Sequence, residues 1–446
     1  MKPRFIHINT FGCQQNEADS ETLMGIACEK GYTPTDNIEE ADLILFNTCA
    51  VREHAELKAL STTGQLKHLK EKKKDLKIGL CGCMVQQEHR KEDIKNKYPY
   101  VDFVFGTNKI SSFGEILDKL ESAKKRIFEV ESYEENPGRI CEGLPVRRKV
   151  PYRALVSVMY GCNNFCTYCV VPYVRGRERS RAPEAVYNEV KSLVENGCKE
   201  IMLLGQNVNS YGKDLETPVS FSKLLEQLCG IEGDFVLKFM TSHPKDVSLE
   251  LIDTIAKNPK IERHFHLPLQ AGSDRILKEM NRRYTFERYF SLIQYMREKI
   301  PEIAVTTDII VGFPGETEDD FQKTLAALEK CRFDGAFSFV YSPRKGTPAA
   351  QMDGRITEEA TKDRMARLLS LQQKIQTENN EKLVGKTLRA LCEGESKSDP
   401  DFHSARSDGG KLIHFKKPEG KDLCGEYVMI KIKEARAIML LGEVIL

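Results

Sequence analysis

Three cysteines stand close together near the middle of the chain, at Cys162, Cys166 and Cys169. Their C-x3-C-x2-C spacing places three thiols on one short loop, where three thiolates could hold three irons of a four-iron cluster. The fourth iron would keep an open position, which the amino and carboxylate groups of an amino acid could occupy. A structural zinc site or three buried thiols are the alternatives, but zinc needs a fourth ligand and the loop offers none nearby. We therefore expect an iron-sulfur cluster with one free coordination position.

Three further cysteines, Cys13, Cys49 and Cys83, lie far apart in the sequence, and each follows a predicted strand. The carboxyl ends of parallel strands share one edge of a sheet, so these side chains could converge there and hold a second cluster. Three unrelated core cysteines remain the alternative, because free cysteine is among the most buried residue types. Cys81 would point to the same strand face as Cys83 if the strand continued that far, which makes it a possible substitute ligand.

Residues 1–120 are predicted to form a flavodoxin-like, doubly wound α/β domain that positions the second set. Short apolar runs alternate with amphipathic helical patterns, which is typical of a parallel sheet. The predicted strands are Phe5–Thr10, Leu43–Asn47, Lys77–Cys81 and Val101–Phe105. Residues 121–147 are charged and broken by proline and glycine, so we interpret them as a linker.

Residues 148–382 are predicted to form a partial (βα)6 barrel, because six strand-helix units fit an open barrel better than a complete eightfold one. The Cys162 loop follows the first of these strands, at the end where barrel enzymes carry their chemistry. A long polar helix from Thr357 to about Lys382 then leads out of the barrel. The predicted strands are Ala154–Val158, Glu200–Leu204, Val236–Met240, Arg263–Leu267, Val305–Val311 and Gly335–Tyr341.

Residues 383–446 change to short alternating segments separated by turns, which predicts a small antiparallel β barrel. The predicted strands are Thr387–Cys392, Lys411–Phe415 and Glu426–Ala435.

The composition, with 30% charged and 40% hydrophobic residues, indicates a folded globular protein. No apolar stretch approaches the roughly 20 residues of a membrane span, and no signal-peptide region stands at the start, so we expect a cytoplasmic protein without membrane association. In that reducing compartment the 14 cysteines favour metal binding or catalysis over disulfides. The net charge of +1 neither requires nor excludes a nucleic-acid partner.

The run Gly-Cys-Asn-Asn-Phe-Cys-Thr-Tyr-Cys-Val-Val-Pro-Tyr, residues 161–173, resembles the radical-SAM methylthiotransferase family. In that superfamily the open iron binds S-adenosylmethionine, which is cleaved to a 5'-deoxyadenosyl radical. The family also carries an auxiliary cluster on cysteines that match Cys13, Cys49 and Cys83, so the resemblance implies two [4Fe-4S] clusters. One departure is Gln15, which stands where a methionine is common in the family.

Polar residues at the ends of the predicted barrel strands are candidates for holding the cofactor. Four of these segments resemble the family's cofactor pocket, although Ala271 stands where serine is usual. Gly312 has an alternative role in a turn that opens the next helix. No side chain other than the cluster ligands is assigned a catalytic role. The expected cofactor-binding residues are Tyr168, Gln206, Asn207, Ser242, His266, Gln270 and Gly312.

Two groups of basic residues are candidate RNA contacts. An alternating run directly follows the cysteine loop, where it suits phosphate contacts, with a solvated charged face as the alternative. The C-terminal segment resembles the TRAM domain, which binds transfer RNA in this family. The expected RNA-binding residues are Arg175, Arg177, Arg179, Arg181, Lys411 and Lys416.

Cys49-Ala50-Val51-Arg52-Glu53 and Leu204-Gly205-Gln206-Asn207-Val208-Asn209 resemble the branch of the family that modifies isopentenyladenosine at position 37 of transfer RNA. The resemblance implies transfer of a methylthio group to C2 of that adenosine, with two cofactor molecules, an electron donor protein and a sulfur donor. The alternatives are threonylcarbamoyl-adenosine in transfer RNA, an aspartate in a ribosomal protein, or a non-catalytic iron-sulfur RNA-binding protein. We expect a monomer.

Overall fold

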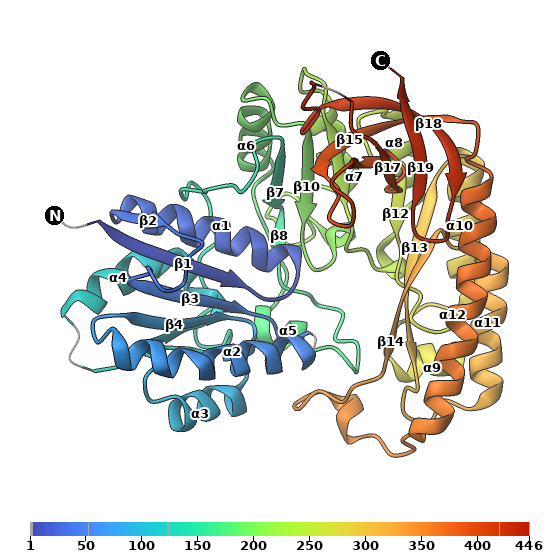
Figure 1. The fold of residues 1–446 in the computed structure, drawn as a ribbon. Helices are drawn as coiled ribbons and strands as arrows, with labels where there is room; N and C mark the ends of the chain where they lie inside the picture. Colours follow the sequence, from blue (N-terminus) through green and yellow to red (C-terminus); the bar gives the residue numbers. More distant parts are fainter. Residues whose placement is uncertain (1–2, 52, 123–124, 419, 446) are drawn as a thin grey trace.

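The structure is a computed structural model that describes residues 3–51, 53–122, 125–418 and 420–445, so Arg52 of the motif above lies outside the described residues. Figure 1 shows an N-terminal α/β unit, an open barrel of strands flanked by helices, and a small C-terminal β barrel against one end of that open barrel. The predicted fold class is confirmed.

The N-terminal unit is a six-stranded parallel sheet in the order β2-β1-β3-β4-β5-β6. Its central strand β3 is buried along its whole length, because apolar clusters and helices cover both faces of the sheet. Neither β2 nor β6 was predicted, and β6 extends the sheet into the segment expected to be a linker. The strands are β1 (Arg4–Thr10), β2 (Tyr32–Pro34), β3 (Leu43–Thr48), β4 (Lys77–Gly82), β5 (Phe103–Phe105) and β6 (Ile127–Glu129).

The connections between these strands contain four α-helices and two 3-10 helices. They are α1 (Gln14–Glu29), α2 (Glu53–Lys72), η1 (Met84–Gln86), α3 (Glu88–Lys97), η2 (Thr107–Ser112) and α4 (Phe113–Ser122).

The partial barrel consists of two three-stranded parallel sheets, β7-β10-β11 and β12-β13-β14, joined by a bridge between Leu237 and Ile261. Its six strands lie within one residue of the predicted ranges at each end. They are β7 (Arg153–Ser157), β10 (Glu200–Leu204), β11 (Val236–Phe239), β12 (His264–His266), β13 (Ala304–Val311) and β14 (Gly335–Val340).

Helices cover the outer face of the barrel and bury one continuous apolar core. The barrel segment also contains the two-residue strands β8 (Met159–Tyr160) and β9 (Arg179–Ser180) beside the cysteine loop, with η3 (Val208–Ser210), η4 (Pro244–Asp246) and η5 (Pro348–Gln351). The α-helices are α5 (Val171–Arg175), α6 (Pro183–Glu195), α7 (Phe221–Cys229), α8 (Leu249–Lys257), α9 (Asp274–Glu279), α10 (Phe286–Lys299), α11 (Glu318–Cys331) and α12 (Glu358–Glu381).

The longest helix, α12, begins after Thr357, whose hydroxyl accepts a hydrogen bond from the backbone N–H of Ala360. This N-cap satisfies one of the free donors at the helix start. Within the described part of the chain, no helix is both long and apolar enough to cross a bilayer.

The two halves of the inner barrel face differ in what covers them. Helix α1 of the N-terminal unit packs on the first half, where Ala18 contacts Met202 and Leu204. On the second half, the paired strands leave Phe337 and Phe339 of β14 exposed, with 50% and 38% of their surfaces accessible. The barrel therefore keeps an open inner wall along β14.

The C-terminal unit is a closed five-stranded barrel in the order β15-β16-β17-β19-β18, of which β16 and β19 were not predicted. It docks at the amino ends of the large barrel's strands, because Arg153 at the start of β7 pairs with both Glu200 of β10 and Glu393 of β15. The cysteine loop lies at the opposite ends of those strands. The strands are β15 (Thr387–Glu395), β16 (Phe402–Ser407), β17 (Leu412–Lys416), β18 (Tyr427–Ala435) and β19 (Leu440–Ile445).

Candidate functional site

Cys13 and Cys49 follow β1 and β3, whose carboxyl ends form the switch point of the N-terminal sheet. Ligands of doubly wound sheets bind at this place, because the connections leave the two strands in opposite directions and open a crevice. Gly12 adopts φ +127°, and a Cβ on it would lie 2.5 Å from the Cβ of Cys49. Glycine is therefore needed for the two cysteine-bearing loops to approach.

The amide of Asn16 stands between the thiols of the first set. The Sγ atoms of Cys13 and Cys83 lie 3.8 and 3.9 Å from its Oδ1. Its Nδ2 donates to the carbonyls of Phe11 and Thr48, which fixes the amide relative to both strand ends. The structure thus brings the three predicted cysteines to one edge of the sheet.

Cys81 and Cys83 do not share a face. Strand β4 ends at Gly82, whose φ of +94° breaks the alternation that the substitute-ligand interpretation required. Cys81 consequently lies in the apolar core with Phe103 and Phe105, whereas Cys83 faces the switch-point side. Burial raises the pKa of the Cys83 thiol to about 12, so its thiolate would form only when a metal displaces the proton.

The second set lies on the loop between β8 and α5, at the carboxyl end of the barrel. Gly161 begins the loop with φ +78°, and a Cβ there would lie 2.0 Å from the carbonyl oxygen of Arg177. Burial and the neighbouring Cys166 raise the pKa of Cys162 to about 11 and that of Cys169 to about 12. The three predicted thiols are therefore close enough to influence one another's ionisation.

No three His, Cys, Asp or Glu side chains of the described residues are arranged to hold a single metal ion. A four-iron cluster binds each thiolate through a different iron, so its ligands stand further apart than those of one ion.

Unsatisfied polar atoms gather at the ends of β10 and β11. Within the described ranges, Asn207 Oδ1, Ser242 Oγ and His243 Nε2 are buried without a hydrogen-bond partner. Buried polar atoms without partners are rare in folded proteins, which points to a polar ligand. Burial and the cations Arg282 and Lys245 lower the pKa of His243, so the surroundings favour a bound anion.

The other expected cofactor residues differ in the contacts that they already make within the protein. Gln206 accepts a hydrogen bond from the backbone N–H of Gly161 and so contacts the cysteine loop. Gln270 adopts φ 72° and bridges to β13, while His266 lies on the inner barrel face, 3.5 Å from Asp308. Tyr168 packs in an apolar cluster that also contains Ala271, whose methyl group suits these surroundings.

The backbone N–H of Gly312 already donates to the Glu316 carboxylate at 2.9 Å, and a Cβ at Gly312 would lie 3.0 Å from Thr361 Oγ1. These contacts favour the turn interpretation of this glycine. Asn209 and His243 stand in motifs that the sequence analysis considered but were not among the expected cofactor-binding residues, and their buried unpartnered atoms become evident only when the strand ends are assembled.

The four arginines of the basic run after the cysteine loop differ in how deeply they are buried. Arg175 and Arg181 are buried and paired with Asp19 and Glu189, so neither presents its guanidinium to a phosphate, contrary to expectation. Arg177 is exposed and stacks on Phe165. The half-buried Arg179 donates to backbone carbonyls of the segment between β6 and β7. Arg177 is the member of this run that remains free to contact RNA.

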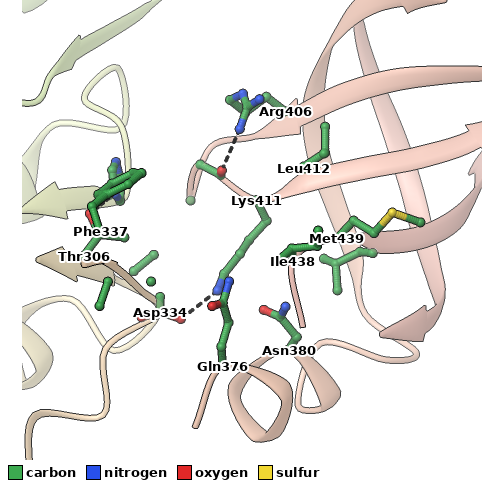
Figure 2. Close-up of a pocket in the computed structure, with 17 residues that line it drawn as sticks. Thr306, Asp334, Phe337, Gln376, Asn380, Arg406, Lys411, Leu412, Ile438 and Met439 are labelled. Carbon is green, nitrogen blue, oxygen red and sulfur yellow. Dashed lines mark hydrogen bonds and ion pairs between the residues drawn. The ribbon is translucent and has the colours of Figure 1, made fainter. Parts of the chain in front are cut away.

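Lys411 also differs from expectation. Figure 2 shows it reaching from the C-terminal barrel to Asp334, with an Nζ to Oδ1 distance of 2.8 Å. The pair lines a cavity of about 340 Å³ between the two barrels, with Gln376 and Asn380 of α12 on another side. Lys411 therefore holds the domains together, whereas Lys416 at the end of β17 is exposed.

The two cysteine sets face each other across the domain junction. Cys83 lies in one buried apolar cluster with Val170, the residue directly after Cys169. On another side of the junction, Arg344 donates to the carbonyl of Val51 and Ser342 donates to Glu53. These junction contacts are made by Val51 and Glu53, which lie two and four residues after Cys49.

Comparisons with known proteins cover all three units. Residues 156–328 match the radical SAM superfamily, residues 5–106 match the uncharacterized protein family UPF0004, and residues 381–445 match the TRAM domain. Among solved structures, the radical S-adenosylmethionine methyltransferase TsrM from Kitasatospora setae has a TM-score of 0.57 at 13% identity, with 83% of this chain and 89% of that chain covered. This similarity establishes the fold alone.

Full-length relatives are much more similar. A tRNA-2-methylthio-N(6)-dimethylallyladenosine synthase from Alkaliphilus oremlandii (strain OhILAs) is 50% identical over 438 residues, which cover 98% of this chain and 92% of the relative. The enzyme of the same name from Clostridium tetani (strain Massachusetts / E88) is 49% identical, with 98% and 95% covered. The chain belongs to the tRNA-2-methylthio-N(6)-dimethylallyladenosine synthase branch of the radical-SAM methylthiotransferase family.

Proposed function

We propose that this chain adds a methylthio group to C2 of N6-isopentenyladenosine at position 37 of transfer RNA. The observation that carries the proposal is the buried apolar cluster that contains both Cys83 and Val170, because Val170 directly follows Cys169 and the cluster therefore joins the surroundings of the two three-cysteine sets. A reaction that needs sulfur chemistry and radical chemistry on one substrate atom requires two such sites beside one cavity. The names of the full-length relatives support the substrate.

Two [4Fe-4S] clusters and S-adenosylmethionine fit the residues present. Cys13, Cys49 and Cys83 would hold the auxiliary cluster, and Cys162, Cys166 and Cys169 the other one. When bound, these groups supply the radical and the sulfur of the transfer. Gln206, Asn207, Ser242 and His243 would orient the cofactor, since the last three have buried unpartnered polar atoms and the cations around His243 suit a carboxylate.

The open inner wall of the barrel suits the adenine and its apolar substituent. Phe337 and Phe339 expose aromatic faces on which a base can stack, and His266 and Asp308 lie beside them. Helix α1 closes the opposite wall, because Gln15 Nε2 donates to Ser157 Oγ at 2.8 Å and Ala18 fills the space above β10. A base entering along β14 would be shielded from water on that side.

Arg177 and Lys416 are the exposed basic residues that we propose as phosphate contacts. Their placement supports a substrate that extends from the cysteine loop to the TRAM barrel. An electron donor protein and a sulfur donor complete the expected partners. We propose that the chain acts as a monomer, and in the cytoplasm because transfer RNA is its substrate.

The proposal is tested by a comparison of substrates. The anaerobically reconstituted protein is incubated with transfer RNA that carries isopentenyladenosine, with transfer RNA that carries threonylcarbamoyl-adenosine, and with a ribosomal protein that contains a modifiable aspartate. We expect a methylthio product only with the first. Product with either of the others would reassign the substrate, and failure to cleave S-adenosylmethionine would favour a non-catalytic iron-sulfur protein.

A further inference from the structure

We propose that Arg175 and Arg282 are positioning residues that set the reduction potentials of the two clusters, one arginine for each three-cysteine set. The inference rests on the proposed function only in taking both sets as iron-sulfur cluster ligands. Both arginines are almost completely buried, with 5% and 4% of the residue surface accessible, and each donates a hydrogen bond to one cysteine sulfur.

Arg175 reaches the first set from the other domain. It ends helix α5 of the barrel segment, yet its Nε lies 3.2 Å from Sγ of Cys83 in the N-terminal unit. Its Nη2 donates to Asn16 Oδ1 at 2.8 Å and to Asp19 Oδ2 at 2.7 Å. This fork of fixed donors holds the Nε–H on the sulfur. This hydrogen bond to the first cysteine set therefore forms only when the two domains are docked.

Arg282 has the corresponding place in the second set. Its Nη1 lies 3.4 Å from Sγ of Cys166, its Nη2 donates to the carbonyl of Pro268, and its Nε donates to the hydroxyl of Tyr284. Over the described ranges, no carboxylate forms an ion pair with it. A buried cation without a counterion is costly, so an anion is expected at this position. Thiolate ligands of a cluster supply that anion.

The electrostatic consequence is the same at both sites. Reduction adds one negative charge to a cluster, and a fixed cation with an N–H directed at a ligand sulfur stabilises the more negative state. Hydrogen bonds to the sulfurs and the local net charge are established determinants of cluster potentials. Removal of either arginine should therefore make its own cluster harder to reduce and leave the other one unchanged.

Replacement of Asp19 should shift the potential of the auxiliary cluster in the opposite direction. Its carboxylate neutralises part of the Arg175 charge at 2.7 Å, and its side chain is 6% exposed. Asp19→Asn removes the negative charge and leaves the arginine on Cys83. We therefore expect Asp19→Asn to raise the auxiliary potential, whereas Arg175→Met lowers it.

The experiment uses the full-length chain with one cluster at a time. Replacement of Cys162, Cys166 and Cys169 by alanine leaves the auxiliary set, and replacement of Cys13, Cys49 and Cys83 by alanine leaves the other. After anaerobic reconstitution, iron content is measured and each midpoint potential is obtained from a redox titration followed by electron paramagnetic resonance.

Arg175→Met and Asp19→Asn are made in the first background and Arg282→Met in the second, with arginine-to-lysine variants as conservative replacements. Two arginines that donate only to backbone carbonyls, Arg126 and Arg297, are replaced by methionine as matched controls.

We expect each arginine-to-methionine variant to shift the reduction equilibrium of its own cluster by about tenfold, or about 59 mV for one electron, toward the oxidised form. The lysine variants should recover part of the shift, because they keep the charge but lose the fork. Unchanged potentials in clusters of full iron content would overturn the proposal.

If an arginine-to-methionine variant fails to bind its cluster, a variant that keeps a positive charge at that position is measured instead. For the auxiliary site, Asp19→Asn must raise the potential, and no change or a lowering counts against the proposal. For the other site, Arg282→Lys must give a potential below that of its parent, and an unchanged value counts against it. Failure of the proposed function is distinct, because it would appear as parent backgrounds that bind no cluster.

Discussion

Cys83 and Val170 belong to one buried apolar cluster at the junction between the N-terminal sheet and the barrel, although 86 residues lie between them in the sequence. Cys83 belongs to the thiol set at the switch point of one domain, and Val170 directly follows the last thiol of the other set. The shared cluster explains how two separately built sites could act on one substrate. Because the two sets share no cysteine, replacement of a ligand in one set leaves the ligands of the other in place.

Cys13→Ala should separate the two chemistries. We expect the variant to lose about four irons, the content of one cluster, and to form no methylthio product. It should still cleave S-adenosylmethionine reductively, because Cys162, Cys166 and Cys169 remain. Iron analysis and chromatography of 5'-deoxyadenosine and of the modified nucleoside provide the measurements.

The matched variant is Cys81→Ala, whose thiol lies in the apolar core and not at the switch point. It should keep full iron content and product formation. Full product formation by Cys13→Ala, or loss of a whole cluster in Cys81→Ala, would show that the ligand assignment is wrong.

Phe337→Ala and Phe339→Ala should impair substrate use, because the aromatic faces on the open wall of β14 are proposed to stack with the base. Loss of one base-aromatic stack costs about 1–3 kcal/mol, so kcat/KM for isopentenyladenosine-containing transfer RNA should fall about fivefold or more. Cleavage of S-adenosylmethionine without RNA should be retained. Leu369→Ala, an equally exposed apolar residue on α12, is the control. Equal kcat/KM values for all three variants would show that the base does not stack on this wall.

The sequence predicted the cysteines of the site better than their surroundings. Alternating apolar runs placed Cys13, Cys49 and Cys83 after parallel strands, and a parallel sheet places such positions on one edge. Asn207 and Ser242 could likewise be placed at strand ends. Local patterns are sufficient for these inferences because each depends on one strand and its end.

Charge roles could not be predicted in the same way. Arg175 and Arg177 look equivalent in the sequence, yet one is buried beside Asp19 and the other is exposed, because the end of α5 turns one side chain into the junction. Lys411 similarly finds Asp334 in another domain. The short strands β2 and β6 lie at the edges of the sheet, where three residues give little periodic signal.

Lys411 and Lys416 should behave differently when each is replaced. Lys411→Met breaks an ion pair whose side chains are 14% and 15% exposed, and should lower the free energy of unfolding by about 1–3 kcal/mol, between the values for exposed and buried pairs. Lys417→Met, which breaks an exposed pair with Glu395 in the same unit, should lower the free energy of unfolding much less than Lys411→Met does. Thermal and denaturant unfolding measure both.

Lys416→Ala should instead weaken binding of transfer RNA. Loss of one phosphate contact reduces the slope of log affinity against log salt by about 0.7–0.9. If Lys411→Met reduced that slope and Lys416→Ala did not, the two assignments would have to be exchanged.

Docking of the C-terminal barrel should depend on acidity through Glu393. Burial opposes its ionisation, but Arg406 and Arg153 outweigh burial and lower the pKa of this carboxyl below its ordinary 4.5. A lowered folded-state pKa means that the stabilisation is complete above about pH 4.5 and is lost as the pH falls through the folded value. Thermal unfolding of the cluster-free protein between pH 6 and pH 3 should therefore show a smaller acid-dependent loss in Glu393→Gln. An identical loss in both proteins would contradict this role.

If the two cysteine sets act together on C2 of isopentenyladenosine, the hydrogen at C2 must pass to the 5'-deoxyadenosyl radical, and isotope transfer reports this step. Transfer RNA carrying deuterium at C2 of that adenosine is incubated with the reconstituted protein and S-adenosylmethionine, and both nucleosides are analysed by mass spectrometry. We expect deuterium in 5'-deoxyadenosine together with a methylthio product that has lost it. A methylthio product formed without deuterium in 5'-deoxyadenosine would contradict this mechanism.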